Sequence, residues 1–564
     1  MKYIIIGAVA GGASTAARLR RMDEKAEILI FEKGEYISYA NCGLPYYIGN
    51  VIKDRNQLFV QTAASFNQRF NIDVRVMTEV TAIDPLQKAI TATNQITGEV
   101  YTESYDKLVL SPGAEPIRPP LPGILSEGIF TVRNVNDTDY IKSYIKEKQA
   151  KKAVIVGAGF IGLEMAENLH HLGLEISIIE MGNQVLAPLD FPLAALVQQQ
   201  IRSKGVDLRL NTPVAGFENE NDQLKVLLKN GEVIDADLVI LSIGVRPETK
   251  LATQAGLKIG TAKGIWVNDY LQTSDPSIYA VGDAIEFTNP ITGQSMNTYL
   301  AGPANKQGRI CANNIALGNH QKYKGSINTA IVKVFDMTVA AAGTASKHLT
   351  VANIEHIVST THSGSHAGYY PGSKQMSIQI AFSPVDGRLY SAQIAGYDGV
   401  DKRIDILSSI IQRKGTIEEL TEFEHAYAPP YSSAKDPVNM AGYVAENILM
   451  NRLKVFYWDE IALLDENACL IDVRTAKEFK SGHISKAISI PVDEMRSRLA
   501  EIPKDKNIYI YCAVGLRGYL ANRIVTQSGF EKVFNLSGGY FLWNACESEL
   551  KSLKEKRSKE AVIS

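Results

Sequence analysis

Two stretches of the chain repeat one pattern, in which a short apolar run is followed by a glycine-rich turn and then by a helix-forming segment. The apolar runs are Lys2–Ile6 and Ala153–Val156. The turns contain, in chain order, Gly7, Ala8, Gly11 and Gly12 in the first copy and Gly157, Gly159 and Gly162 in the second. Each copy continues into a second apolar run that ends in an acid, Glu32 or Glu180, roughly 20 residues beyond the last glycine. This spacing predicts two dinucleotide-binding domains of the Rossmann type.

The residue types in this pattern suit a bound pyrophosphate and its ribose. Glycine lets the backbone turn tightly and approach the phosphates, and the helix N-terminus offers free N–H groups and partial positive charge. The carboxylate accepts hydrogen bonds from ribose hydroxyls. A single fingerprint resembles an ordinary helix cap, and Val9 replaces the middle glycine of the first copy. Two copies with correctly spaced acids nevertheless favour a binding role for both.

Composition limits what else the chain can be. A length of 564 residues fits roughly three to five domains, and 45% hydrophobic with 21% charged residues excludes a mainly disordered chain. The net charge of -2 gives no general attraction for nucleic acid, and no apolar run reaches the roughly 20 residues that span a bilayer. The N-terminus begins a strand at once and lacks the features of a signal peptide. We therefore expect a cytoplasmic protein that binds neither nucleic acid nor a membrane.

The five cysteines are few, odd in number and widely spaced. This distribution argues against a disulfide scaffold and against a structural zinc site, so no metal is expected. Free thiols are then available for chemistry in a reducing compartment. We interpret Cys311, Cys469 and Cys546 as small core residues, which leaves Cys42 and Cys512 as candidates for a reactive role.

Two dinucleotide sites suggest two cofactors that exchange electrons, and here the sequence resembles the flavin-dependent pyridine nucleotide–disulfide oxidoreductases. Leu108–Ala114 resembles the crossover out of the first domain, and Ile278–Asp283 resembles the family's second flavin motif. The resemblance implies FAD at the first fingerprint and a nicotinamide nucleotide at the second. It also adds four residues to the FAD site: Ser111, Gly113, Asp283 and Ala304. The ordinary alternative for Asp283, a turn residue after a strand, is disfavoured by the position of the motif after the second fingerprint.

Glu180 also bears on the choice between NADH and NADPH. A carboxylate at this strand end pairs with a free 2'-hydroxyl and repels a 2'-phosphate. The following residues, 181–183, include no arginine that could receive a phosphate. We expect NADH, with NADPH left open.

Cys42 lies in the segment Ser38–Tyr46, where most disulfide reductases of this superfamily carry two neighbouring cysteines. A single cysteine cannot form an internal disulfide there, so the thiol must cycle through a mixed disulfide, a persulfide or a sulfenic acid. A helix is expected to begin just after Cys42, and its dipole to stabilise the thiolate. The segment resembles the coenzyme A disulfide reductases. Related NADH oxidases and peroxidases carry a histidine in the first glycine turn. This chain has Ala10 there, which argues against oxygen or peroxide as the substrate.

Resemblance to the coenzyme A disulfide reductases implies a set of substrate-binding residues. They are Ser14, Arg18, Arg21, Ser38, Asn41 and, from the other subunit of a homodimer, Lys435. Arg18 and Arg21 share a helix face, for which a solvated surface is the ordinary alternative. Tyr369 and Tyr427 match family residues that reach the partner's cysteine, where a phenol can donate a proton to the leaving thiolate. Interface packing is the alternative for both.

A different pattern begins near Asp459. The segment Leu470–Arg474, followed by the strand Ile508–Tyr511 and the loop 512–518, resembles a single rhodanese domain. A small-residue loop between strand and helix points successive backbone N–H groups at the Cys512 sulfur, which stabilises thiolate and persulfide anions. Arg517 adds a cation at the end of this loop. The loop composition disfavours the alternative of an inert buried cysteine.

These patterns predict an α/β chain with two Rossmann-like dinucleotide-binding domains, an α+β dimerisation domain and a C-terminal α/β rhodanese domain. The FAD-binding domain is expected to be discontinuous, with the nicotinamide domain inserted into it. The expected bounds are 1–112 and 246–325 for the FAD-binding domain, 113–245 for the NAD(P)H-binding domain, 326–448 for the dimerisation domain, 449–457 for a linker and 458–556 for the rhodanese domain.

We therefore expect an FAD-dependent oxidoreductase that passes electrons from NADH to a sulfur–sulfur bond at Cys42. The expected substrates are coenzyme A persulfide, polysulfide or coenzyme A disulfide, with Cys512 relaying sulfane sulfur and sulfide released. Coenzyme A is expected as a substrate or as a bound group whose arm moves between the two cysteines. Three alternatives remain: a plain coenzyme A disulfide reductase, an NADH oxidase or peroxidase, and a non-enzymatic redox- or sulfide-sensing module.

Overall fold

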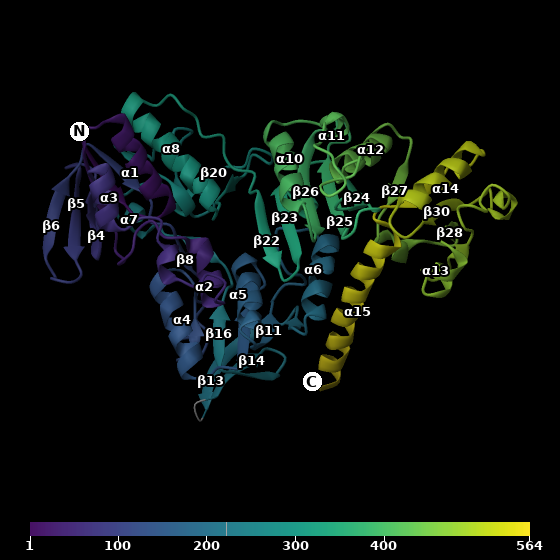
Figure 1. Ribbon diagram of the computed structural model, residues 1–564, viewed down its shortest axis with the longest axis horizontal. Coiled ribbons are helices and arrows are strands. Elements are labelled where there is room, and N and C mark those ends of the chain that lie inside the picture. Colours follow the sequence, from purple (N-terminus) through teal and green to yellow (C-terminus); the bar gives the residue numbers. More distant parts are fainter. Residues whose placement is uncertain (221–222, 564) are drawn as a thin grey trace. The chain divides into compact units, whose positions relative to one another are not determined.

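The computed structural model describes residues 1–220 and 223–563, and for 554–563 it describes the helix alone. The chain forms two compact units (Figure 1). The first contains Met1–Met181 and Thr212–Asn328, and the second contains Gly182–Asn211 and the described part of Thr329–Ser564. Among the described residues, no helix is both long enough and apolar enough to cross a membrane.

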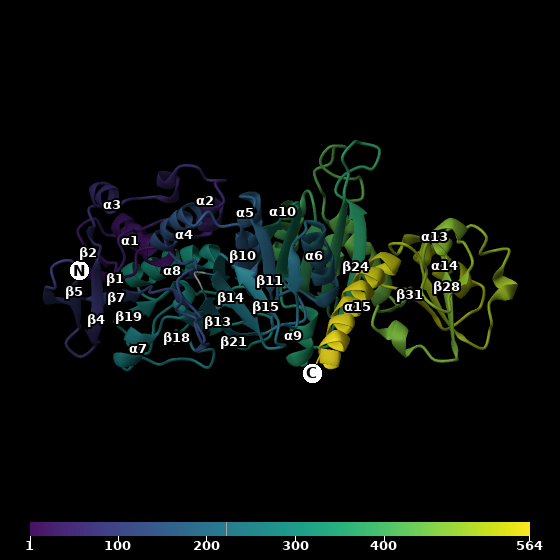
Figure 2. The same cartoon turned by 90° about the horizontal axis from the view of Figure 1, so that it is seen from below.

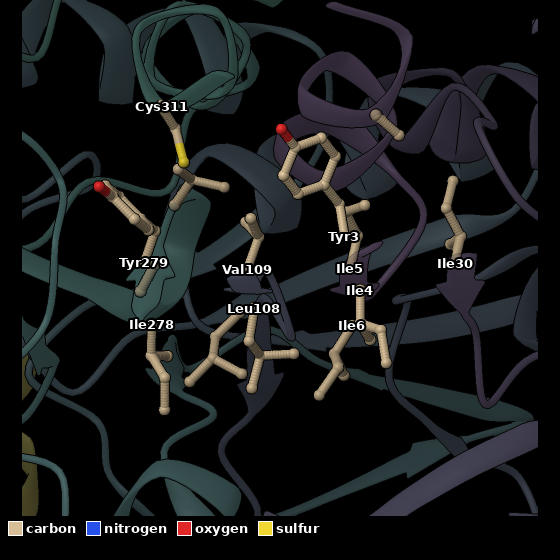
Figure 3. Close-up of a cluster of buried hydrophobic side chains, with 14 of the residues drawn as sticks. Tyr3, Ile4, Ile5, Ile6, Ile30, Leu108, Val109, Ile278, Tyr279 and Cys311 are labelled. Carbon is tan, nitrogen blue, oxygen red and sulfur yellow. The ribbon is translucent and has the colours of Figure 1, made fainter. Parts of the chain in front are cut away.

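The first unit contains a five-stranded parallel sheet with the strand order β19-β7-β1-β2-β3. Its strands are β1 (Lys2–Ile6), β2 (Glu27–Phe31), β3 (Asp73–Arg75), β7 (Lys107–Leu110) and β19 (Ile278–Ala280). After a charged first residue, the strands β1, β2 and β7 are apolar, as expected for strands that are buried on both faces of a parallel sheet. Figure 3 shows side chains of β1, β7 and β19 in this core, in the same cluster as the fully buried Cys311. The sheet thus joins two parts of the chain that are separated by the second glycine fingerprint.

Helix α1 (Ala10–Met22) follows the first glycine turn and packs against α8 (Ala301–Leu317). Gly308 permits this close approach, because a Cβ there would lie 2.6 Å from the carbonyl oxygen of Gly11. The Nε of Arg18 also donates to Oδ1 of Asn313 across the pair, at 3.0 Å. The N-terminus of α8 is thereby held next to the first glycine turn.

The second fingerprint lies in a further parallel sheet of the first unit, in which β11-β10-β16-β9 are neighbours. These strands are β9 (Ile129–Phe130), β10 (Lys152–Val156), β11 (Glu175–Ile179) and β16 (Leu238–Leu241), and α5 (Phe160–His171) follows the glycine turn. Two three-stranded antiparallel sheets are formed by β4 (Thr78–Asp84), β5 (Ala89–Asn94) and β6 (Val100–Ser104), and by β13 (Val214–Glu220), β14 (Gln223–Leu228) and β15 (Val233–Ala236). The remaining helices of the unit are α2 (Leu44–Ile48), α3 (Ala63–Phe70), α4 (Val135–Glu147) and α7 (Lys250–Gln254). Short strands complete it: β8 (Ala114–Pro116), β17 (Val245–Pro247), β18 (Ile265–Trp266), β20 (Ile285–Thr288) and β21 (Ser295–Met296).

The second unit contains an antiparallel sheet with the order β22-β23-β26-β25-β24. Its strands are β22 (Ala330–Val334), β23 (Met337–Gly343), β24 (Ile357–Gly364), β25 (Gln375–Phe382) and β26 (Leu389–Gly396). The unit also contains the helices α6 (Phe191–Ser203), α9 (Ser346–Val351), α10 (Val400–Gln412), α11 (Ile417–Glu422) and α12 (Pro437–Leu449) and the short strand β12 (Asp207–Arg209). Residues 182–211 belong to this unit because the buried Asp190 accepts hydrogen bonds from the side chains of Gln379 and Gln393, at 2.8 and 2.7 Å.

The second sheet of this unit is parallel, with the order β27-β31-β30-β28-β29. The strands are β27 (Lys454–Phe456), β28 (Ala468–Asp472), β29 (Ile488–Ser489), β30 (Asn507–Tyr511) and β31 (Val533–Leu536), with helices α13 (Ala476–Lys480), α14 (Leu516–Gln527) and α15 (Gly539–Ile563). α15 runs beside α6 in both views (Figures 1 and 2), where the buried Glu549 accepts from Gln198 Nε2 at 2.9 Å.

The segment 449–457, predicted as a linker, differs from that expectation. It contains β27, which pairs with β31 and forms the edge of the rhodanese-like sheet. Three residues of alternating character are too short a signal to distinguish an edge strand from a connector. Residues 454–456 of the expected linker are therefore a strand of the C-terminal parallel sheet.

Candidate active sites

The first glycine turn has the geometry of a phosphate cradle. Gly7 has φ +95°, a conformation that favours glycine, and a Cβ on Gly12 would collide with the carbonyl oxygen of Gly7. The Glu32 carboxylate lies at the end of β2, where it accepts hydrogen bonds from the backbone N–H groups of Ala8, at 3.0 Å, and Gly34, at 2.8 Å. Turn and acid are therefore held together as the fingerprint requires.

The second turn repeats this arrangement. Gly157 has φ +102°, a Cβ on Gly162 would collide with the Gly157 carbonyl oxygen, and Ala158 N–H donates to Glu180 Oε2 at 2.8 Å. Nothing lies within 4 Å of the position where a Cβ on Gly159 would stand. The turn thus has an open side above the N-terminus of α5, which suits the pyrophosphate of a nicotinamide nucleotide.

Four further residues complete the surroundings of the first turn. A Cβ on Gly11 would lie 3.0 Å from Ser111 Oγ and 3.6 Å from the carbonyl oxygen of Ala304. Gly113 has φ +77° and open space beside it. Asp283, in the 3₁₀ turn Gly282–Ala284, receives no hydrogen bond from the described residues, and burial raises the pKa of its carboxyl to about 6. An unpartnered, largely buried carboxylate fits the hydroxyls of a flavin's ribityl chain, so the residues present fit FAD.

Cys42 lies in the 3₁₀ turn Asn41–Gly43, directly before α2, so the helix begins where the sequence predicts. Ser38, with φ +45°, connects this segment to the first glycine turn through a hydrogen bond from its N–H to the carbonyl oxygen of Ala8, at 2.8 Å. The side chain of Cys42 is exposed to solvent. Its position is therefore fixed by the turn that is expected to hold FAD.

The expected stabilisation of the Cys42 thiolate is not what the surroundings produce. Partial burial raises the pKa of the thiol, and the carboxylates of Glu164 and Asp283 raise it further. The following helix α2 is only a short one, Leu44–Ile48. Desolvation and two acids outweigh a single-turn helix end, because a dipole effect falls off within the first turn.

Glu164 is a functional candidate that sequence reasoning missed. It lies on α5, and Oε1 accepts a hydrogen bond from the Tyr46 hydroxyl of α2 at 3.3 Å. Burial raises the pKa of Glu164 to about 7, the Tyr46 bond opposes this rise, and Glu167 adds to it. A glutamate two residues after the last fingerprint glycine carries no chemical signal alone, since only the packing of α2 on α5 brings it near Cys42.

The predicted coenzyme A residues of the first unit lie on α1 and around Cys42. Ser14 contacts Asn305 and Arg18 contacts Asn313, both on α8, whereas Arg21 is exposed one turn further along α1. Asn41 is exposed beside Cys42. The structure thus divides the predicted set, with Ser14 and Arg18 engaged by α8 and with Arg21 and Asn41 open to solvent.

The predicted residues of the second unit come together from two distant segments. The hydroxyls of Tyr369 and Tyr427 lie 2.8 Å apart, and both side chains are exposed. The hydrogen bond to Tyr427 raises the pKa of Tyr369. Lys435 is exposed next to Asp436, which is fully buried in an ion pair with Arg403 at 2.8 Å. That buried pair anchors the segment that carries Tyr427 and Lys435.

Cys512 is buried at the end of β30, and its Sγ accepts a hydrogen bond from the backbone N–H of Gly515 at 3.1 Å. Gly515 has φ +114°, which lets the loop turn its N–H groups toward the sulfur. Tyr540 N–H at the start of α15 donates to the carbonyl oxygen of Cys512 at 2.8 Å. One backbone N–H of the loop, that of Gly515, therefore contacts the sulfur, and the anion-binding role of the loop stays a prediction. Arg517 lies at the end of this loop, and its two terminal nitrogens donate to the carboxylate of Glu478.

No metal site emerges from the part of the chain that the structure describes. Residues 1–220 and 223–563 contain no group of three His, Cys, Asp or Glu side chains placed to hold an ion.

Comparison with known proteins agrees with these features. The chain matches the family model described as pyridine nucleotide-disulphide oxidoreductase over residues 1–308 and the rhodanese-like domain over residues 459–546. The coenzyme A disulfide reductase of Staphylococcus haemolyticus is 39% identical over 447 residues, which are 79% of this chain and 100% of that protein.

Two solved structures cover nearly the whole chain. The reduced CoADR-RHD of Bacillus anthracis is 48% identical, with a TM-score of 0.95 over 97% of this chain and 98% of that one. An NAD-dependent persulfide reductase from A. fulgidus is 39% identical, with a TM-score of 0.90 over 96% of this chain and 100% of that one. These likenesses confirm the predicted fold class and enzyme class. The chain therefore belongs to the pyridine nucleotide-disulphide oxidoreductases, in the group that includes the coenzyme A disulfide reductases, and carries a rhodanese-like domain.

Proposed function

We propose that this flavoenzyme uses NADH to reduce the sulfur–sulfur bond of coenzyme A persulfide, polysulfide or coenzyme A disulfide through Cys42. The observation that carries the proposal is the placement of one exposed thiol in a segment tied to the first glycine turn. The other four cysteines lie at 311, 469, 512 and 546, far along the chain from Cys42, and all five are free. An external sulfur compound must then be the oxidant of this thiol.

The cofactors follow from the two cradles. FAD, held by the first turn with Ser111, Asp283 and Ala304, supplies two-electron transfer between the nicotinamide nucleotide and sulfur. Glu180 favours NADH, because its carboxylate lies at the strand end beside the second turn and would repel a 2'-phosphate. The thiols are suited to a reducing cytoplasm.

The chain's own groups account for the sulfur chemistry. The Cys42 thiolate attacks the sulfur attached to coenzyme A, forming a Cys42–coenzyme A disulfide and releasing the other half as a thiolate, or as hydrosulfide when the substrate is a persulfide. Glu164, with a pKa of about 7, holds a proton close to this exchange. Protonated Glu164 lowers the negative charge next to Cys42, which favours its thiolate form.

A homodimer would complete the site. The exposed pair Tyr369–Tyr427 offers a hydrogen-bond donor to a leaving thiolate, and Lys435 a cation for a coenzyme A phosphate, both directed to the partner subunit's Cys42. We assign to Arg18 and Arg21 the remaining phosphate contacts. Cys512 would take sulfane sulfur from a donor and pass it to coenzyme A, whose arm links the two cysteines.

The test is anaerobic NADH oxidation by the purified enzyme with coenzyme A disulfide, coenzyme A persulfide and polysulfide, with released sulfide measured. The proposal predicts turnover with all three and sulfide from the last two. Cys512→Ser is expected to lose the response to persulfide donors other than coenzyme A persulfide and to keep coenzyme A disulfide reduction, with Cys469→Ser as the control. Full sulfide release by Cys512→Ser from every donor would contradict the relay and leave a plain coenzyme A disulfide reductase.

A further inference from the structure

The loop around Cys512 contains one cation, and that cation is neutralised. Within residues 512–518 only Arg517 is basic. Its two terminal nitrogens donate to the two carboxylate oxygens of Glu478, each at 2.7 Å. The hydrogen bond and the charge of Glu478 raise the pKa of Arg517. A negative charge on the Cys512 sulfur raises this pKa as well. The Arg517 cation is therefore near the sulfur, but the carboxylate of Glu478 neutralises its charge.

Glu478 stays ionised at every relevant pH. The hydrogen bond from Arg517 and, to a smaller extent, the bonds from Thr475 together lower its pKa to about 2, and Thr475 and Glu478 form a capping box at the start of α13. The carboxylate thus offsets the guanidinium charge permanently. A dianionic donor approaching this loop would meet no net positive charge from the pair.

A second cation near the loop, Arg474, is also paired with a carboxylate. Arg474 donates to the Asp472 carboxylate at 2.6 Å and to the carbonyl oxygen of Gly482 at 2.6 Å. Its guanidinium lies 3.9 Å from the ring centroid of Tyr540, whose N–H binds the Cys512 carbonyl oxygen. Arg474 thus packs against α15, and because it is buried it offers no free charge to a donor.

The exposed part of the loop is apolar instead. Leu516 follows Gly515, the donor to the Cys512 sulfur, and is 61% exposed. Phe541 is 39% exposed, and its N–H binds the carbonyl oxygen of Ala513 at 3.0 Å. Leu520, one turn after Leu516 on α14, is also exposed. Apolar side chains therefore border the solvent-exposed side of the loop.

We propose that the sulfur donor of Cys512 is an alkyl persulfide carried on an apolar arm and that the site discriminates against sulfur oxoanions such as thiosulfate. The inference deepens the relay role proposed above and rests on it. The Cys512 thiolate attacks the outer sulfur of the donor, the donor's sulfur–sulfur bond breaks, and the donor leaves as a thiolate that takes a proton from water. Cys512 becomes a persulfide, and no further oxidant or reductant is consumed. With thiosulfate the leaving group would be sulfite, a dianion that the neutralised Arg517 does not stabilise.

The test uses full-length, flavin-loaded Cys42→Ser enzyme without NADH, so that only the Cys512 site reacts. Its persulfide formation is timed by intact-protein mass spectrometry with N-acetylcysteamine persulfide or thiosulfate as donor. The alkyl persulfide is expected to react at least roughly tenfold faster in second-order rate. Equal or faster reaction with thiosulfate would overturn the proposal. Because NADH is absent, this result is independent of whether the flavin site reduces persulfides.

Glu478→Gln then tests the cause. Glutamine keeps the capping box with Thr475 but frees the charge of Arg517, so the thiosulfate rate is expected to rise severalfold and the ratio of the two donors to fall. Glu501→Gln is the control, because Glu501 also accepts two hydrogen bonds of 2.7 Å from one arginine, Arg498, through Nε and a terminal nitrogen. It is expected to change neither rate. Leu516→Lys, which adds a cation at an exposed loop position, is expected to act in the same direction as Glu478→Gln. An unchanged donor ratio in both Glu478→Gln and Leu516→Lys would refute the electrostatic explanation.

Discussion

Glu164→Gln is the change that most directly tests the electrostatics around Cys42. Burial moves the pKa of Glu164 from its usual 4.5 to about 7. A shift of this size corresponds to roughly 3 kcal/mol of disfavoured ionisation in the folded protein, at roughly 1.4 kcal/mol per pKa unit. The glutamine variant cannot ionise, and its Oε1 can still accept the hydrogen bond from Tyr46.

The sign follows from proton linkage. Between about pH 4.5 and about pH 7 the folded protein keeps the Glu164 proton and the unfolded chain has lost it, so the wild-type protein loses stability as the pH rises through this window. Above about pH 7 the loss is complete and constant. Relative to wild type, Glu164→Gln is therefore expected to gain up to about 3 kcal/mol between about pH 5 and about pH 8.

Urea-induced release of flavin, followed by fluorescence at a series of pH values, measures this difference in the unit that carries α5. Glu147→Gln, an exposed carboxylate on α4 of the same unit, is the control and is expected to show no such trend. Tyr46→Phe removes a bond that lowers the pKa of Glu164, so its stability loss should extend to higher pH. If the difference in unfolding free energy between Glu164→Gln and wild type does not change between about pH 5 and about pH 8, Glu164 does not have the raised pKa.

Three further changes test other parts of the account. Glu180→Ala is expected to reduce the preference for NADH over NADPH, in kcat/KM, by roughly tenfold, because it removes the acid that repels a 2'-phosphate. Gly12→Ala is expected to yield colourless protein with little bound flavin by absorbance, since a Cβ there collides with the turn backbone. Arg403→Met removes the guanidinium that pairs with the buried Asp436 carboxylate and should cost about 3–5 kcal/mol in urea unfolding; Arg413→Met, which breaks an exposed pair, should cost about 1 kcal/mol or less.

The local elements of both cysteine sites were predictable because each depends on short-range rules. Gly7 and Gly157 adopt positive φ where a tight turn requires it, and a helix begins directly after Cys42. Strand, loop and helix around Cys512 likewise follow from one continuous segment. Such features need no knowledge of what packs against them.

What the sequence left undetermined depends on contacts between distant segments. Glu164 lies 122 positions after Cys42 in the printed sequence and acquires its raised pKa only through burial against α2. Arg517 was expected to add a cation at the end of the loop, but its pairing with Glu478, on another helix, could not be predicted from the local segment. The elevated pKa of Cys42 has the same origin, since desolvation and remote carboxylates outweigh the local helix end. Charge balance at a site is a tertiary property, and residue order alone does not reveal it.

In the proposed mechanism, the solitary thiol of Cys42 exchanges with an external sulfur–sulfur bond. Rapid mixing of NADH with oxygen-free wild-type and Cys42→Ser enzyme, each saturated with FAD and given coenzyme A persulfide, measures this directly. The account predicts that both bleach the flavin absorbance, and that wild type then releases sulfide while the serine variant turns over roughly 10³-fold or more slowly. Sulfide release by Cys42→Ser at the wild-type rate would contradict it.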